Sequence, residues 1–446
     1  MSRYSSLAVL GTALLALSAA CRFEPPRPIL RYSLNSKEIA KNADMAGNSA
    51  HQEHLLGALE FLFGTPQHPN FLVLPDWTDE EPEFDPNYWS LDGLSEAEKA
   101  AMRASNARAY AGQIAAIRAG DFDSVEKPRY ADDLWEDWLR LVEERRANPG
   151  ADRNWIEEGA ELFESYYPEL TVSAELYRQQ CFHCHGSEGG GDGSTSQFLD
   201  PLPRDYRPGI FKFTAEQNKA HPRNADLFRI LKEGIYTTAM PSFRRFTDAQ
   251  LHGLTDYVKL LSIRGETEIL MIADYDPYAG IQPETLIENY RLVVDRWRNA
   301  ANDFFAYEGE IPESTPERVA HGRDLYTSEQ GANCVKCHGA TGRGDGESVK
   351  NNPKDAIDEW GNPILPRDLT RGVFRLGRRP IDLYRRVYAG INGTPMPAHF
   401  GMQITEKDGT KRMLDENDVW DLVFFVRSLS ARSPRAEPAH PAQEHP

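Results

Sequence analysis

The sequence predicts a mainly α-helical chain whose second half holds two homologous domains. An internal repeat spans residues 170–430, and its matching segments occur in the same order in both copies. Apolar residues also recur at helical spacing, for example at Leu134, Trp138, Leu141 and Val142. The chain has 446 residues, of which 40% are hydrophobic and 26% charged. This is the composition of a globular protein long enough for two or three domains.

The chain is acidic, because 50 Lys and Arg residues against 68 Asp and Glu residues give a formal charge of −18. Such a surface repels nucleic acid and anionic lipid headgroups, so neither is expected as a partner. It would suit docking to a basic protein surface, although solubility alone explains the charge equally well.

Residues 1–20 are typical of an export signal peptide. Arg3 supplies the positive start, residues 6–17 are apolar, and residues 18–20 are small, as cleavage requires. The apolar stretch is too short to span a bilayer, and no other stretch approaches the required length. We therefore expect an exported chain whose mature form has no membrane-spanning helix.

Cys21 follows the small residues directly and lies outside the two cysteine motifs described below. Residues 17–21 resemble a bacterial lipobox, in which the cysteine becomes the lipidated first residue of the mature chain. Plain cleavage after Ala20, which would leave a free thiol, is the alternative. The lipobox interpretation predicts a periplasmic lipoprotein that is anchored to the membrane at Cys21, with residues 21–35 as the anchor and tether.

Residues 36–165 contain no cysteine and carry no recognisable chemical motif. Residues 54–63, 95–119 and 130–147 show helical patterns, and residues 65–88 read as a long loop rich in proline and aspartate. We therefore expect a helical N-terminal region of unknown fold.

Seven pairs of matching segments define the repeat. They are residues 181–186 with 334–339, 189–193 with 342–346, 202–205 with 365–368, 209–212 with 372–375, 226–229 with 382–385, 239–243 with 395–400, and 254–262 with 422–430. They predict two domains, at residues 166–263 and 316–430, which we call the first and second repeat domains. Between them, residues 264–315 hold one expected helix, at 283–305, interpreted as a bridge. The tail at 431–446 lacks large apolar residues and is expected to be disordered.

Each repeat domain contains one C-x-x-C-H motif. The motifs are Cys181, Cys184 and His185 in the first domain, and Cys334, Cys337 and His338 in the second. This motif is the signature of c-type haem attachment, in which both thiols bond to the haem and the histidine ligates its iron. The sequence thus predicts two covalently bound haem c groups. A zinc site or disulfides would explain neither the trailing histidines nor the methionines that follow.

Met240 and Met396 are the expected second iron ligands. Met240 lies 55 residues after His185, and Met396 lies 58 residues after His338. Each precedes a proline, which favours an extended loop that can present a thioether. The alternative is that both methionines only pack in the core, but they would then share the same repeat position by chance. His399 is a competing ligand in the second repeat domain.

Arg204 and Arg367 occupy the same place in the repeated Leu-Pro-Arg-Asp segment. We interpret them as cofactor-binding residues that pair with haem propionates. Pairing with the neighbouring Asp205 and Asp368 is equally consistent with the sequence. The prolines of this region favour a loop that walls the haem and offers a backbone carbonyl to the ligand histidine.

On these motifs the repeat resembles tandem class I cytochromes c. In that family one helix leads into C-x-x-C-H, a loop carries the methionine ligand, and a closing helix crosses the first. Residues 174–180 and 317–327 match the leading helix, and 251–262 and 418–430 match the closing one. The glycine-rich turn and the Leu-Pro-Arg-Asp segment also resemble cytochrome subunits of bacterial respiratory or dehydrogenase complexes. The resemblance covers about half of the chain and omits the N-terminal region.

The resemblance implies a mainly α fold with two cytochrome c-type haem domains that transfer electrons. Expected partners are redox proteins, with a membrane complex or dehydrogenase as donor and an oxidase downstream. A two-haem peroxidase is the rival interpretation, because such enzymes also carry two C-x-x-C-H domains. It needs one iron with an exchangeable site, whereas both domains here offer a methionine. A redox or gas sensor is a third interpretation, which no signalling segment supports.

Overall fold

The computed structural model describes residues 30–69, 103, 106–107, 110–128, 131–166, 170–214, 220–299, 307, 309–352, 354, 356–375 and 377–431. The expected signal peptide, Cys21 and the expected tail after residue 431 lie outside these residues, as does most of the expected loop at 65–88. Within them the chain is mainly helical, with one antiparallel pair of short strands. The predicted fold class is therefore confirmed. Every described helix is too short or too polar to cross a lipid bilayer.

The N-terminal segment packs on the first repeat domain. Its helices are α2 (Ser36–Lys41), α3 (Ala43–Ala46) and α4 (Ser49–Phe63). Tyr32, Met45 and Leu55 lie in the same hydrophobic core as residues of that domain. A buried ion pair between Arg264 and Glu268, 2.9 Å long, fixes this contact because Glu268 also accepts the backbone N–H of Asn35.

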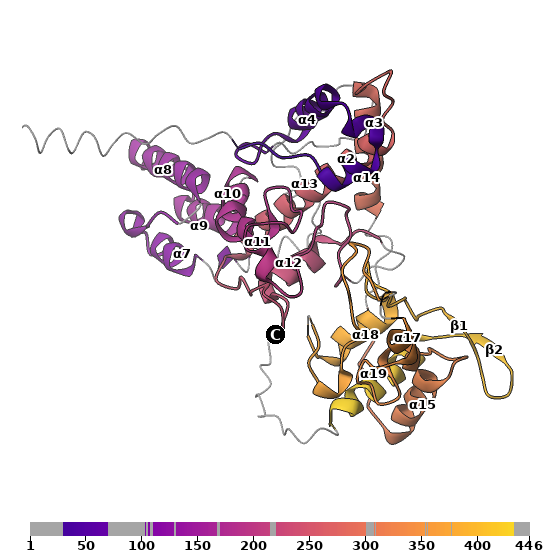
Figure 1. Ribbon diagram of the computed structural model, residues 1–446. Coiled ribbons are helices and arrows are strands. Elements are labelled where there is room, and N and C mark those ends of the chain that lie inside the picture. The colour runs from indigo at the N-terminus through magenta and orange to yellow at the C-terminus, as the bar shows by residue number, and fades with distance from the viewer. Residues whose placement is uncertain are drawn as a thin grey trace, which may run out of the picture.

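The next part of the N-terminal region forms a core of its own. It comprises α7 (Ala111–Arg118), η1 (Phe122–Ser124), α8 (Asp132–Ala147) and α9 (Trp155–Ser165). Trp138 is almost fully buried, stacks on Phe122 and meets the edge of Phe163. Figure 1 shows these helices on one side of the first repeat domain, away from the second.

The first repeat domain consists of α10 (Leu170–Gln180), α11 (Phe182–His185), η2 (Ser196–Phe198), α12 (Asn224–Glu233) and α13 (Asp248–Ala273). A capping box of Thr247 and Gln250 starts α13, which packs against both α10 and α12. This helix continues ten residues past the predicted domain end at residue 263, because its buried face extends to Met271 and Ile272.

The helix predicted as a bridge is α14 (Pro283–Asn299), and it extends the first repeat domain instead. It packs against α13, and Tyr290, Val293 and Trp297 are buried in that domain's core. The Nε1–H group of Trp297 also donates to Glu266 of α13 at 2.8 Å. Amphipathic spacing predicted the helix, but which neighbour would cover its apolar face depended on tertiary packing.

The second repeat domain is built on α15 (Pro316–Thr327), α16 (Val335–His338), α17 (Glu347–Asn351), η5 (Leu369–Arg371), α18 (Pro380–Ala389), β1 (Gln403–Thr405), β2 (Lys411–Met413) and α19 (Glu416–Ala431). Thr315 caps α15, and its side chain accepts the backbone N–H of Arg318. Helices α15 and α19 cross closely because Gly322 has no side chain. A Cβ atom there would lie 1.9 Å from the carbonyl oxygen of Asp421.

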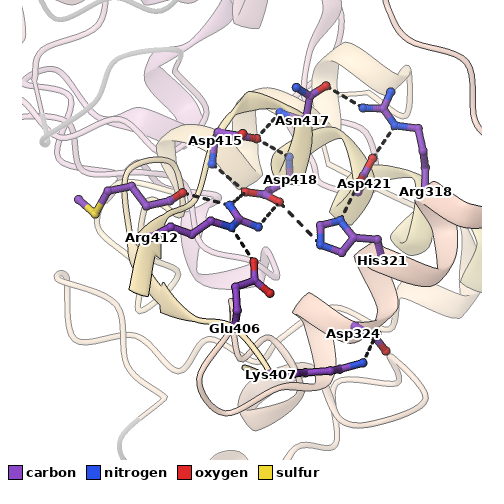
Figure 2. A network of polar contacts seen from close by, with 11 residues as sticks. Arg318, His321, Asp324, Glu406, Lys407, Arg412, Asp415, Asn417, Asp418 and Asp421 are labelled. Carbon is purple, nitrogen blue, oxygen red and sulfur yellow. Dashed lines mark hydrogen bonds and ion pairs between the residues drawn. The ribbon is translucent and has the colours of Figure 1, made fainter. Parts of the chain in front are cut away.

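A polar network braces this crossing and joins it to the hairpin (Figure 2). Arg318 donates to Asp421 of α19 at 2.7 Å, and the Nδ1 atom of His321 lies 2.9 Å from the same carboxylate. Arg412 of β2 donates to the buried Asp418 at 2.9 Å. The leading helix, the closing helix and the hairpin thus share one network of charges.

Candidate haem sites

Both C-x-x-C-H motifs lie on short helices that follow the leading helices directly. In the first repeat domain α11 follows α10, and in the second α16 follows α15 after a short turn. Cys181, Cys184, Cys334 and Cys337 are all free thiols rather than disulfide partners. One turn of helix brings each histidine back beside its first cysteine, since the N–H groups of His185 and His338 donate to the carbonyls of Cys181 and Cys334 at 2.9 Å.

The same hydrogen bonds hold both motifs. Tyr177 donates its hydroxyl to the carbonyl of Gly186 at 2.9 Å, and Tyr326 donates to the carbonyl of Gly339 at the same distance. The glycine-rich turns then close over the motifs through matched backbone bonds. Gly191 donates to the carbonyl of His185 at 3.0 Å, as Gly344 does to that of His338 at 2.9 Å.

Each motif histidine is oriented by a backbone carbonyl. The Nδ1 atom of His185 lies 3.3 Å from the carbonyl oxygen of Arg204, and that of His338 lies 3.3 Å from the oxygen of Arg367. Burial lowers the pKa of His185 to about 4 and also lowers the pKa of His338. Both imidazoles are thus neutral near pH 7, with Nδ1 engaged and Nε2 left as the metal-binding nitrogen.

The carbonyl predicted from the proline-containing loop is therefore that of the arginine after Pro203 or Pro366. The sequence indicated the loop but not the residue. The repeat could have identified this residue, because the Leu-Pro-Arg-Asp segment is the only proline-containing segment that both copies share between the glycine-rich turn and the methionine.

The two methionines sit on loops with the same geometry. The N–H of Ile235 donates to the carbonyl of Met240, and the N–H of Ile391 donates to that of Met396, both at 3.1 Å. Inside each loop a threonine hydroxyl, of Thr238 or Thr394, caps the turn. It accepts the N–H of the methionine at 3.1 Å in the first loop and 3.2 Å in the second. The two methionines are therefore held by loops with the same pattern of hydrogen bonds.

The first repeat domain encloses a cavity of about 310 Å³ between its motif and its methionine loop. Its walls include Cys181, Cys184, His185 and Met240, together with mostly apolar side chains. The residues fit haem c: two free thiols and a neutral imidazole share a cavity with a thioether, and apolar walls surround them. The predicted ligands His185 and Met240 are thus brought together.

The guanidinium groups of Arg204 and Arg367 do not pair with the aspartates beside them. Asp205 binds Arg207 instead, and Asp368 accepts hydrogen bonds from Thr370. Arg204 contacts Asp358 at 3.2 Å. The guanidinium of Arg367 donates to Thr237 in the methionine loop of the first repeat domain. Both arginines therefore reach across the boundary between the repeat domains.

His399 occupies in the second repeat domain the place that Phe243 has in the first. The N–H of Phe243 donates to the carbonyl of Leu231, and that of His399 donates to the equivalent Val387, both at 3.1 Å. His399 is buried, and its Nδ1 atom has no hydrogen-bond partner. The sequence repeat pairs Phe243 with Phe400 instead, because both are phenylalanine. That pairing requires an insertion of one residue in the second copy, which the structure does not support.

Sequence reasoning missed four residues near these sites: Lys212, Asp358, Trp360 and Arg375. The basic residues at 212 and 375 were visible as a matched pair in the repeat. The other two belong to a segment that only the second copy contains, so no repeat signal marked them.

Comparisons with known proteins match each repeat domain separately. Residues 168–258 match the family of cytochrome c oxidase, cbb3-type, subunit III, and residues 319–430 match the cytochrome c family. A chain of the reducing HAO-like protein complex of Kuenenia stuttgartiensis is similar, at 27% identity and a TM-score of 0.43. The similarity covers 58% of this chain and 94% of that one. No curated protein matches. With one family match on each half of the repeat, the chain carries two cytochrome c-type domains in tandem.

Proposed function

We propose that this chain is a periplasmic dihaem electron-transfer protein. When bound at these sites, each haem iron would accept and release one electron. At each site the chain's own residues supply two thiols for attachment, an imidazole held by a carbonyl, and a thioether on a loop closed by backbone hydrogen bonds. The observation that carries the proposal is that the histidine support and the methionine loop are the same in both domains. A peroxidase would need one iron with an open or exchangeable site, whereas both domains offer a methionine at the matched position.

The proposed partners are redox proteins, with a membrane complex or dehydrogenase as the donor. A net charge of −18 would steer docking to a basic face of such a partner. We further propose that a lipid on Cys21 holds the protein at the membrane, which would keep it near a membrane donor.

Haem content tests the core of this proposal. Protein matured in a host with c-type maturation should keep two haems after denaturation and acid extraction, because thioether bonds survive unfolding. Cys334→Ser should keep the haem of the first repeat domain. A mass for wild type with one haem or none would refute the proposal.

Carbon monoxide separates a carrier from a peroxidase. If a methionine closes each site, the reduced wild type should bind little carbon monoxide and turn over negligible peroxide. Ready binding at one haem together with peroxide turnover would favour the peroxidase.

Anchoring is tested by fractionation. Wild type should sediment with membranes, whereas Cys21→Ser should be soluble or incorrectly processed. A wild type found wholly in the soluble periplasmic fraction would refute the lipid anchor and leave the electron-transfer proposal intact.

A further inference from the structure

A segment of the second repeat domain reaches across to the first. The step from Gly193 to Leu202 is 9 residues in the first copy, whereas the step from Gly346 to Leu365 is 19 residues in the second. The extra residues include Trp360, whose Nε1–H group donates to the carbonyl of Asp205 at 2.6 Å.

This segment places one carboxylate between two cations of the first repeat domain. The Oδ2 atom of Asp358 lies 3.2 Å from Arg204 and 3.0 Å from the Nζ atom of Lys212. The guanidinium of Arg204 also stacks 3.7 Å above the ring of Trp360. Asp358 and Lys212 are both buried, so this is a desolvated cluster rather than a surface ion pair.

Arg375 brings a third cation to the same place from the second repeat domain. It lines the cavity that holds Cys181, His185 and Met240, as Arg204 and Lys212 do. Its Nε atom is buried and has no hydrogen-bond partner. A guanidinium that reaches into another domain's cavity with a buried donor unsatisfied indicates a missing acceptor.

The charges of this cluster are not balanced by the protein. Arg204 and Lys212 both bind the buried Asp358, Asp205 is engaged by Arg207, and the carboxylate that acts on Arg375 is the exposed Asp200. Arg367 lies near enough to Arg375 to add to the repulsion. Burial, together with the neighbouring Arg204, lowers the pKa of Lys212 to about 8. Cations therefore outnumber carboxylates at this end of the cavity, and the two propionates of one haem c would supply further negative charge.

We propose that Arg375 of the second repeat domain binds a propionate of the haem held by the first, together with Arg204 and Lys212. The inference rests on the proposed haem content of both domains. If Arg375 binds in this way, residues of both repeat domains form the first haem site. A change in how the domains pack would therefore alter the potential of the first haem.

The test measures potentials of the loaded protein by spectroelectrochemistry. All variants are made in a Met396→His background, which lowers the potential of the second haem and separates the two waves. Arg375→Gln removes a cation that disfavours ferric iron, so the potential of the first wave should fall. We expect a shift of about threefold to tenfold in its reduction equilibrium, where tenfold is ~59 mV for one electron.

Matched variants separate binding from a general charge effect. Arg371→Gln makes the same charge change at an exposed position four residues away and should leave the first wave nearly unchanged. Arg375→Lys should restore most of the potential, and Asp358→Asn should move the first wave upward. Equal effects of Arg371→Gln and Arg375→Gln, or a shift of the second wave alone, would overturn the inference. Covalent haem content, measured first on each variant, shows whether the proposed function itself has failed.

Discussion

The two repeat domains share the parts that hold a motif and differ in what surrounds them. Tyr177 and Tyr326 make the same bond to a glycine carbonyl, and both methionine loops are closed by the same backbone bonds. Around these parts, the first domain is covered by the N-terminal helices and α14, whereas the second is braced by its own hairpin and ion pairs. Duplication has kept the ligand framework while the environment of each site changed.

Two buried positions next to the sites also differ. Tyr206 in the first repeat domain corresponds to Leu369 in the second, because each N–H donates to the carbonyl of the equivalent glycine. Phe243 corresponds to His399. Buried polarity near a haem tunes its potential and its access to ligands, so the two sites are expected to differ in both.

The largest effect should come from removing each methionine. Met240→Ala leaves Phe243 nearby, which cannot ligate iron, so the first site should gain the carbon monoxide binding that we expect wild type to lack. Met396→Ala leaves the buried His399, whose Nδ1 atom has no hydrogen-bond partner. We expect this histidine to replace the methionine as iron ligand, so the second site should bind far less carbon monoxide. Flash photolysis of the carbon monoxide complexes measures both.

The double variant Met396→Ala/His399→Phe controls for differences in access. It gives the second site the apolar residue of the first and should restore carbon monoxide binding there. If Met396→Ala alone binds as well as Met240→Ala, the difference at His399 has no consequence for ligation.

The methionine loops, in contrast, should respond alike. A Cβ atom on Gly234 would lie 2.5 Å from the backbone of Pro241, and one on Gly390 would lie 2.6 Å from that of Pro397. Both glycines also have positive φ, at 69° and 75°. Each change to alanine should cost about 3 kcal/mol and weaken the absorption band of methionine-ligated ferric haem.

Gly401→Ala is the matched control for these loops. Its φ is 69°, yet a Cβ atom there would meet nothing within 4 Å. It should cost about 1 kcal/mol, and the methionine band should stay. Loss of the band for only one of Gly234→Ala and Gly390→Ala would break the equivalence of the two loops.

A smaller, unequal effect is expected at the paired tyrosines. Tyr177→Phe leaves two buried groups unsatisfied, the carbonyl of Gly186 and the hydroxyl of Tyr206, which lies 2.5 Å from that of Tyr177. Tyr326→Phe leaves no such group, because the carbonyl of Gly339 also accepts the N–H of Gly342 at 3.1 Å. We expect costs of about 2–3 kcal/mol for Tyr177→Phe and about 1 kcal/mol for Tyr326→Phe, read from hydrogen exchange of α10 and α15. Equal costs would mean that Tyr206 contributes nothing to the first site.

The sequence predicted what depends on local spacing and on the repeat. Attachment residues within one helical turn, such as Cys181 and His185, follow from covalent geometry. The contacts of Arg204 with Asp358 did not follow, because they join residues 154 positions apart through a segment absent from the first copy. The position of α14 and the role of His399 also depended on tertiary packing, which a pattern of letters does not encode.

The smallest effect should be confined to the second repeat domain and should depend on pH. Burial pushes the pKa of Asp418 upward, but hydrogen bonds from Arg412 and from the backbone N–H of Asp415 outweigh it and hold the pKa below its usual value. A lowered carboxylate pKa stabilises the fold above the unfolded pKa near 4, and this stability is lost as the pH falls through the folded pKa.

Arg412→Gln should therefore cost about 1 kcal/mol at pH 7, since Arg412 is partly exposed, and the difference from wild type should shrink in acid. Lys407→Gln, in the turn of the same hairpin, is the control. Its partner Asp324 is half exposed, so it should cost at most about 0.5 kcal/mol. Hydrogen exchange of α19 at several pH values measures both changes.

Because the described part of the first repeat domain has no hairpin, Arg412→Gln should leave the hydrogen exchange of α13 unaffected. A loss of protection in α13 as large as in α19 would show that the two domains unfold as one unit.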